Sequence, residues 1–157
     1  MKMKIVDLVA FVRGSEPYTA VRPPKTKIEY AVQKVCFRIL TSLKDPEKIL
    51  EEARTALREK YAMVDADGCY MFRMKEVNGK PVEVYKYTAE KYALLKKDMA
   101  ALEEKYLQQE IEIEPHIVEK FPPMSEYEVS IFRGLVIPKN YQLAEPIEDE
   151  SELINQL

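Results

Sequence analysis

Residues 26–61 read TKIEYAVQKVCFRILTSLKDPEKILEEARTALREKY, and this stretch has the spacing of a long amphipathic helix. Its apolar side chains recur at steps of three and four residues, which places them on one side of a helix. Thr26 is a suitable N-cap because its hydroxyl can accept a hydrogen bond from the first turn. The expected buried stripe consists of Ile28, Val32, Val35, Ile39, Leu43, Leu50, Ala53, Leu57 and Tyr61.

Pro46 interrupts this stretch without changing the phase of its apolar positions. A proline inside a helix removes one backbone donor and crowds the carbonyl four residues earlier. Two interpretations follow. Either one long helix kinks at Pro46, or Asp45 caps a second helix whose first residue is Pro46. The two halves are roughly collinear in both cases, and we favour a kink or a brief break.

Residues 88–107 form the expected partner of this helix. Thr88 is the predicted N-cap, and the apolar positions Tyr92, Leu95, Met99, Leu102 and Tyr106 again recur at steps of three and four. This second helix is only long enough to cover the part of the first helix beyond Pro46. We therefore expect a protruding helical arm over about residues 46–107, and a compact base that covers the rest of the long helix.

Residues 69–87 have the alternation of a β-hairpin at the tip of that arm. Asn78-Gly79 is the strongest short-range signal for a two-residue type I′ turn. We expect one apolar or aromatic face and one charged face, and the apolar face of such a hairpin must rest on the helices or on a partner chain. The alternating residues are Tyr70, Phe72 and Met74 against Met71, Arg73 and Lys75, and Val82 and Val84 against Glu83 and Tyr85.

The base is expected to begin with a strand at residues 3–5. Asp7 is the predicted N-cap of a short helix that runs to about Val12 and stops at Gly14, with Leu8, Phe11 and Val12 as its buried stripe.

The prolines of residues 15–24 predict an extended loop after this helix. Its Tyr18, Arg22 and Lys25 leave two interpretations open: a binding segment, or a connector that lies across the core. We favour the connector.

Residues 109–118 alternate apolar and acidic side chains, which predicts a half-exposed strand. Its acidic face requires an opposite charge across a ladder, and Lys2 and Lys4 of the first strand supply it, so we expect these two segments to pair. Ser125 and Glu128 have the spacing of a capping box that opens a last short helix. The prediction is therefore a single α+β domain over residues 1–138, followed by a flexible acidic tail at residues 139–157.

Composition restricts the function classes. The 157-residue chain has a formal net charge of −3, which gives no field that would gather nucleic acid or an anionic membrane. Cys36, Cys69 and the single His116 are too few for a four-ligand zinc site. His116 has no obvious nucleophile to activate and is interpreted as a structural or surface histidine.

An acidic turn at residues 65–68 superficially resembles the start of a calcium-binding loop. The pattern fails inside the loop, where Cys69 and Tyr70 stand in place of an oxygen ligand and the required glycine. No nucleophile elbow, phosphate-binding loop or Cys/His/Asn set occurs, so we expect no enzyme activity and no cofactor. No apolar run approaches the length of a membrane span, and the first residues lack a signal-peptide core, so a cytoplasmic location is expected.

The order of these elements resembles a family of small bacteriophage-encoded proteins of unknown function, often found among virion and tail genes. The features that carry the resemblance are a long helix ending in Glu59-Lys60-Tyr61, the turn and hairpin insert, a second helix, the acidic strand Glu110-Ile111-Glu112-Ile113 and the Ser-capped closing helix. The resemblance covers roughly residues 3–137. It implies a phage or prophage origin and a role in structure or assembly, and it supplies no catalytic residues.

We therefore expect a non-enzymatic component that binds a protein partner or self-associates through the helical stripe or the hairpin tip. The candidate partner-binding residues are Tyr70, Phe72, Arg73, Lys75, Tyr85 and Tyr87. The first alternative is a small nucleic-acid-binding regulator that uses the cations of the hairpin tip. The second is a carboxylate- or metal-dependent hydrolase hidden among the 27 acidic residues.

Overall fold

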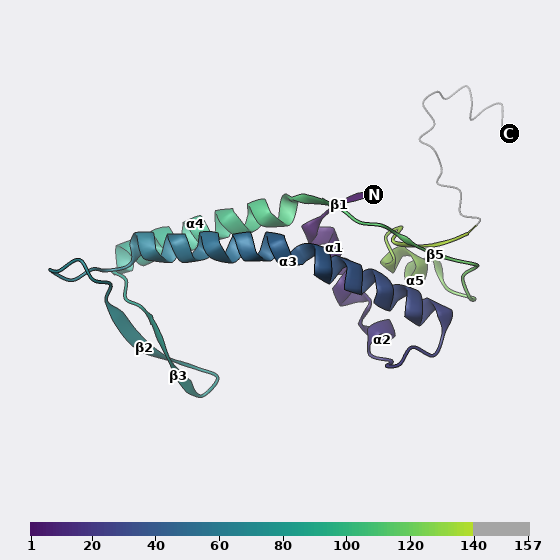
Figure 1. Ribbon diagram of the computed structural model, residues 1–157, viewed down its shortest axis with the longest axis horizontal. Helices are drawn as coiled ribbons and strands as arrows, with labels where there is room; N and C mark the ends of the chain where they lie inside the picture. Colours follow the sequence, from purple (N-terminus) through teal and green to yellow (C-terminus); the bar gives the residue numbers. More distant parts are fainter. Residues whose placement is uncertain (140–157) are drawn as a thin grey trace, which may run out of the picture.

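A computed structural model describes residues 1–139 of the chain. An arm of two helices extends from a compact base, and a β-hairpin folds back from the far end of the arm (Figure 1). The elements are β1 (Lys2–Lys4), α1 (Ile5–Gly14), α2 (Glu16–Thr19), α3 (Lys27–Tyr61), β2 (Phe72–Val77), β3 (Lys80–Tyr85), α4 (Ala89–Gln108), β4 (Glu110–Glu112), β5 (His116–Val118), α5 (Glu126–Ile131) and β6 (Val136–Pro138). This mixture confirms the α+β class. The predicted tail, apart from Lys139, lies outside the described residues.

The long helix α3 passes through Pro46 without a break. Thr26 caps it in a complete capping box with Glu29, as predicted. The alternative of a second helix capped by Asp45 is therefore wrong. In Figure 1 the axis of α3 bends near its middle, and Pro46 lies close to the midpoint of its residue range. The buried stripe of α3 continues across the proline, from Leu43 before it to Leu50 after it. This burial stabilises the helix on both sides, so the loss of one backbone hydrogen bond at Pro46 does not end it.

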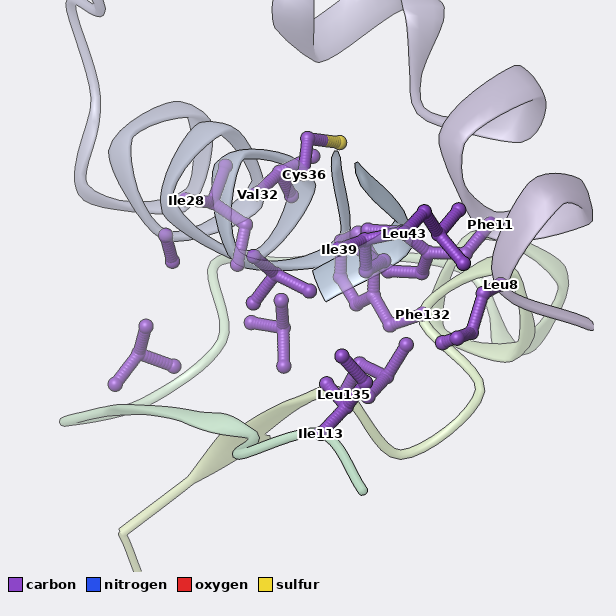
Figure 2. Packing of buried hydrophobic residues seen from close by; sticks show 14 of the residues in the cluster. Leu8, Phe11, Ile28, Val32, Cys36, Ile39, Leu43, Ile113, Phe132 and Leu135 are labelled. Carbon is purple, nitrogen blue, oxygen red and sulfur yellow. The ribbon is translucent and has the colours of Figure 1, made fainter. Parts of the chain in front are cut away.

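The core lies in the base, on one side of the first half of α3. Figure 2 shows Ile39 and Leu43 of α3 beside Leu8 and Phe11 of α1. Phe132, Leu135 and Val136, which follow α5, belong to the same core. Its buried members are Ile5, Leu8, Phe11, Ile28, Ala31, Val32, Val35, Cys36, Ile39, Leu43, Ile113, Val118, Phe132, Leu135 and Val136.

Two predictions for the start of the base are wrong in detail. The first helix, α1, begins at Ile5 rather than after Asp7, and Asp7 lies in its first turn, where a carboxylate interacts favourably with the helix dipole. The predicted extended loop contains the short helix α2, with Pro17 in its first turn, a position that suits proline. Gln33 of α3 donates hydrogen bonds to two carbonyl groups of this connection, 3.1 and 2.7 Å away. The connection therefore lies against the core, as the connector interpretation requires.

The predicted pairing of the first strand with the acidic strand is confirmed. β1 and β4 are antiparallel, with Lys2 opposite Glu112 and Lys4 opposite Glu110. The acidic strand is shorter than predicted, because the chain turns at Pro115. Residues 116–118 form β5, which pairs in parallel with β6 in a separate two-stranded sheet.

The last helix and the arm follow the predicted capping. Ser125 and Glu128 form the capping box of α5, and Thr88 caps α4 by accepting a hydrogen bond from the Lys91 amide. α4 packs along the second half of α3, and an ion pair of 2.9 Å between Arg54 and Glu103 joins the two helices. None of the helices among residues 1–139 is long and apolar enough to cross a bilayer.

Candidate partner-binding surface

The backbone of Met63, just after α3, fixes the hairpin to the end of the arm. The Met63 amide donates to the carbonyl of Lys86 at 2.8 Å, and the Met63 carbonyl accepts from the amide of Met71 at 2.9 Å. Met63 therefore bonds to both legs of the hairpin at once. This junction directs β2 and β3 away from the axis of α3 (Figure 1).

The two-residue turn at the tip is confirmed. Asn78 and Gly79 have φ values of 51° and 77°, the positive values that a type I′ turn requires at both central residues. The strands pair from Val77 opposite Lys80 to Phe72 opposite Tyr85.

The predicted division into an apolar face and a charged face is wrong. Directly opposite residues share a face of a sheet. The register places Val84 opposite Arg73 and Val82 opposite Lys75, so the two valines lie among cations. The other face has the aromatic residues but also Glu83, which lies opposite Met74. Each face is therefore mixed.

The helices of residues 1–139 leave most of the hairpin exposed. All six residues of β2 are exposed, including Phe72 at 48% and Met74 at 62% of their maximal areas. Val82 of β3 is 42% exposed. The helices therefore cover the hairpin only in part, at Val84 and Tyr85 of β3, which are half-buried.

Aromatic contacts stiffen the part of the hairpin nearest the arm. Tyr85 stacks on Phe72 with ring centroids 5.0 Å apart, and it meets Tyr70 edge-on at 5.3 Å. Tyr87 contacts Tyr92 of α4 at 5.9 Å. Such pairs each add about 0.5–1.5 kcal/mol beyond area burial. The aromatic residues therefore form a semi-rigid surface that starts on α4 and continues along the hairpin.

A groove of about 540 Å³ lies between the hairpin and the end of the arm. We call it the hairpin groove; its lining residues are Arg58, Phe72, Arg73, Lys75, Glu83, Val84, Tyr85, Tyr87, Tyr92 and Leu95. Five of the six predicted site residues line it. Tyr70 does not, although its ring contacts Tyr85, which does.

Arg58 and Glu83 are not among the residues predicted to bind a protein partner, and Tyr92 and Leu95 were assigned only to the helical stripe. One signal was available: Tyr92 is four residues after the Thr88 cap, so it must lie on the first turns of α4, beside the hairpin.

Charges around the hairpin groove divide into paired and unpaired groups. Arg58 is neutralised by Glu51 at 3.0 Å, and the phenol of Tyr85 donates to Glu59 at 3.5 Å. Partial burial, and then the charge of Glu59, raise the pKa of Tyr85. Arg73 and Lys75 form no ion pair with any residue in the described part of the chain. The groove thus offers two free cations beside an aromatic surface.

The other candidate sites have simpler structural explanations. Asp65 accepts the amides of Asp67 and Cys69 at 2.9 and 3.0 Å, so its carboxylate closes a turn. His116 lies edge-on to Tyr30 at 6.0 Å, and partial burial, followed by the charges of Arg38 and Lys34, lowers its pKa. Within residues 1–139 no group of three or more His, Cys, Asp or Glu side chains is placed to hold a metal ion.

Comparison with models of protein families, with curated proteins and with solved structures found no match to this chain. The resemblance to phage proteins therefore stays a prediction.

Proposed function

We propose that this protein is a non-enzymatic protein–protein interaction component, in which the helical arm presents the hairpin to a protein partner. The observation that supports this proposal is the exposure of β2 and β3. A two-stranded hairpin is marginally stable in water unless its side chains rest on another surface. Phe72 and Met74 on one face of the hairpin are 48% and 62% exposed, and Val82 on the other face is 42% exposed. Neighbouring apolar groups with this exposure mark binding sites.

The resemblance to phage proteins supplies the setting for this proposal. A virion component or an assembly factor of a phage or prophage binds other proteins of the particle, which is the use that an exposed hairpin on an arm suits. A second copy of the chain is one form of the partner, because the apolar stripe of the arm is only partly covered: Leu57, Met99 and Leu102 are half-buried.

A second candidate function is nucleic-acid binding by the hairpin. The observation that favours it is that Arg73 and Lys75 are exposed and form no ion pair within residues 1–139. Against it, Arg54 and Arg58 of the adjoining helix are bound to Glu51, which reduces the positive charge available to phosphates.

Site-specific photo-cross-linking tests the proposal and separates it from this alternative. A photoreactive amino acid replaces Phe72 in one variant and the exposed Glu126 of the base in a control, in cells that express the gene naturally. We expect a discrete protein adduct from position 72 that is absent from position 126. An adduct that nuclease removes would support the nucleic-acid alternative, and equal adducts from both positions would contradict a binding role of the hairpin.

Analytical ultracentrifugation determines whether the partner is a second copy. Self-association would give a concentration-dependent mass above 18.3 kDa. Replacement of Phe72 and Met74 by serine should return the mass to that of the monomer if the hairpin mediates it.

A further inference from the structure

The register of the hairpin determines which backbone groups face outward. In an antiparallel pair, alternate residues exchange hydrogen bonds across the ladder, and the residues between them direct their N–H and C=O groups away from the partner strand. The amide of Lys86 donates to the carbonyl of Met71 at 2.9 Å, which fixes the phase. The residues whose backbone groups face outward are therefore Phe72, Met74 and Glu76 on β2, and Pro81, Glu83 and Tyr85 on β3.

The two outer edges differ in their capacity to accept another strand. Pro81 has no N–H and lies at an outward-facing position, so it interrupts the donor row of β3. β2 has an unbroken row of three outward-facing residues. Among the described residues these two strands pair only with each other within a sheet. The open edge of this hairpin is thus the outer edge of β2.

The side chains of β2 specify what an added strand must look like. Arg73 and Lys75 are on one face and Phe72 and Met74 are on the other. A strand that hydrogen-bonds to Met74 places its own residues opposite Arg73 and Lys75 in non-hydrogen-bonded pairs, where side chains approach most closely. Acidic side chains at those two positions, with an apolar residue between them, would complement the edge.

The base of the same protein contains this pairing already. Lys2, Met3 and Lys4 of β1 lie opposite Glu112, Ile111 and Glu110 of β4. The Ile5 amide donates to the Gln109 carbonyl and the Ile113 amide to the Met1 carbonyl, both at 2.8–2.9 Å, which puts Met3 in a hydrogen-bonded pair. The run Arg73-Met74-Lys75 repeats the order cation, methionine, cation, with the same phase toward its open edge.

A second copy of β2 fits this edge poorly. Antiparallel pairing of two β2 strands about Met74 places Arg73 opposite Lys75 of the other copy, and pairing about Lys75 places the two lysines opposite each other. Like charges directly opposite on a sheet are destabilising. Charge therefore favours a different strand as the occupant.

We propose that the outer edge of β2 accepts an extended segment of a protein partner with the pattern acidic–apolar–acidic, its two acids opposite Arg73 and Lys75. This inference rests on the proposed function, because it names the chemistry of the partner that the hairpin binds. The added strand contributes main-chain hydrogen bonds for affinity and its acids for specificity. It also turns the marginal two-stranded hairpin into a three-stranded sheet.

The test uses the full-length protein and a fluorescein-labelled synthetic peptide, QQEIEIEP, which copies residues 108–115 around β4. Fluorescence anisotropy measures its binding to two matched variants, Met74→Pro and Glu83→Pro. These residues are directly opposite each other, and each substitution removes one outward N–H while leaving the ladder of the hairpin intact. We expect Met74→Pro to weaken binding about tenfold or more and Glu83→Pro to leave it unchanged.

A charge exchange tests the side-chain part of the proposal. The double variant Arg73→Glu, Lys75→Glu should lose the acidic peptide and bind the peptide QQKIKIEP, in which lysines replace the first two glutamates. The double variant Lys2→Glu, Lys4→Glu is the control, because it makes the same change at β1.

Three results would overturn the proposal: no saturable binding, equal weakening by both proline substitutions, or binding that responds to the β1 control and not to Met74→Pro. The last result would mean that the peptide replaces β4 in the base. A protein adduct at position 72 in the cross-linking experiment, together with no peptide binding, would leave the proposed function standing and reject only this choice of partner.

Discussion

Replacing Leu95 by alanine should loosen the arm and the hairpin while the base stays folded. Within the described part of the chain Leu95 is the only buried residue of α4, at 6% exposure, and it also lines the hairpin groove. The substitution removes three carbon atoms, which at about 0.8 kcal/mol each amounts to about 2.4 kcal/mol. In a rigid core, the free energy of the cavity left by the lost atoms would add to this cost. Because the groove beside Leu95 is open to solvent, the residues around Leu95 can relax, and this additional cost is small.

This loss should appear as local opening rather than global unfolding. α3 has no backbone donor at Pro46, and the buried core lies on the base side of that residue, so opening of the arm can stop there. A cost of about 2.4 kcal/mol corresponds to a factor of about 60 in the opening equilibrium. Amide hydrogen exchange in residues 50–61 and 89–100, and at the hairpin residues whose amides face the partner strand, should therefore be about 60 times faster than in the wild type.

Hydrogen exchange followed by mass spectrometry measures this change by segment. Leu94→Ala is the matched control, because it removes the same three carbon atoms from a residue that is 45% exposed rather than buried. Its effect should stay within about 0.5 kcal/mol. Equal acceleration of the base amides around Val35 and Ile39 in Leu95→Ala would refute the reasoning, since arm and base would then unfold as one unit.

Three further predictions concern single features of the fold. Thr26→Ala removes the capping box of α3 and should lower the free energy of unfolding by about 1 kcal/mol in chemical denaturation. Gly79→Ala places a side chain at a φ of 77° and should speed hydrogen exchange in the hairpin by about fivefold, the equivalent of about 1 kcal/mol, without changing the stability of the base. Partial burial and the nearby charges of Arg38 and Lys34 lower the pKa of His116, so the folded state disfavours its protonation. Stability should therefore fall as the pH decreases below about 6.5, and His116→Gln should reduce that fall in melting curves recorded between about pH 7 and pH 5.5.

The helical part of the fold was predictable because periodicity and capping act locally. The Thr26, Thr88 and Ser125 caps all occur as expected, since each depends only on a hydroxyl and an amide three residues later. The pairing of β1 with β4 was also predictable, because their charges are complementary along the whole short strand.

The errors arose where one residue type suits two conformations. Pro17 is compatible with an extended loop and with the first turn of a helix, and the chain forms the helix α2. Pro115 stands inside an alternating pattern that continues across it, yet it separates β4 from β5 into different sheets. The faces of the hairpin were misassigned although the predicted turn already determines the register. With Asn78-Gly79 as the two turn residues, Val77 lies opposite Lys80, and counting back along both strands places Val82 opposite Lys75. The prediction considered the alternation of each strand separately and did not apply this register.

The hairpin groove could be predicted only in part. Its tyrosines and cations are visible in the sequence, but the contribution of Arg58 and Leu95 depends on the direction in which the hairpin leaves the arm. That direction is set by the backbone bonds of Met63, and these are independent of side-chain type. The periodicity of apolar residues in the sequence therefore does not predict these backbone hydrogen bonds.

The two cation–methionine–cation strands differ in what surrounds them, and this difference determines which one remains open to a partner. Met3 packs against the core, and β4 follows directly after α4, so the acidic strand reaches β1 as part of the same folded unit. Ile113, the residue after β4, is 2% exposed. A competing strand that displaced β4 would also have to bury an apolar side chain in the place of Ile113. Within residues 1–139, Met74 is 62% exposed and β2 pairs with no strand except β3. The cation–methionine–cation run is therefore paired in the base and unpaired along its outer edge on the hairpin among the described residues. For this reason we expect a partner with the proposed acidic–apolar–acidic segment to bind the arm without opening the base.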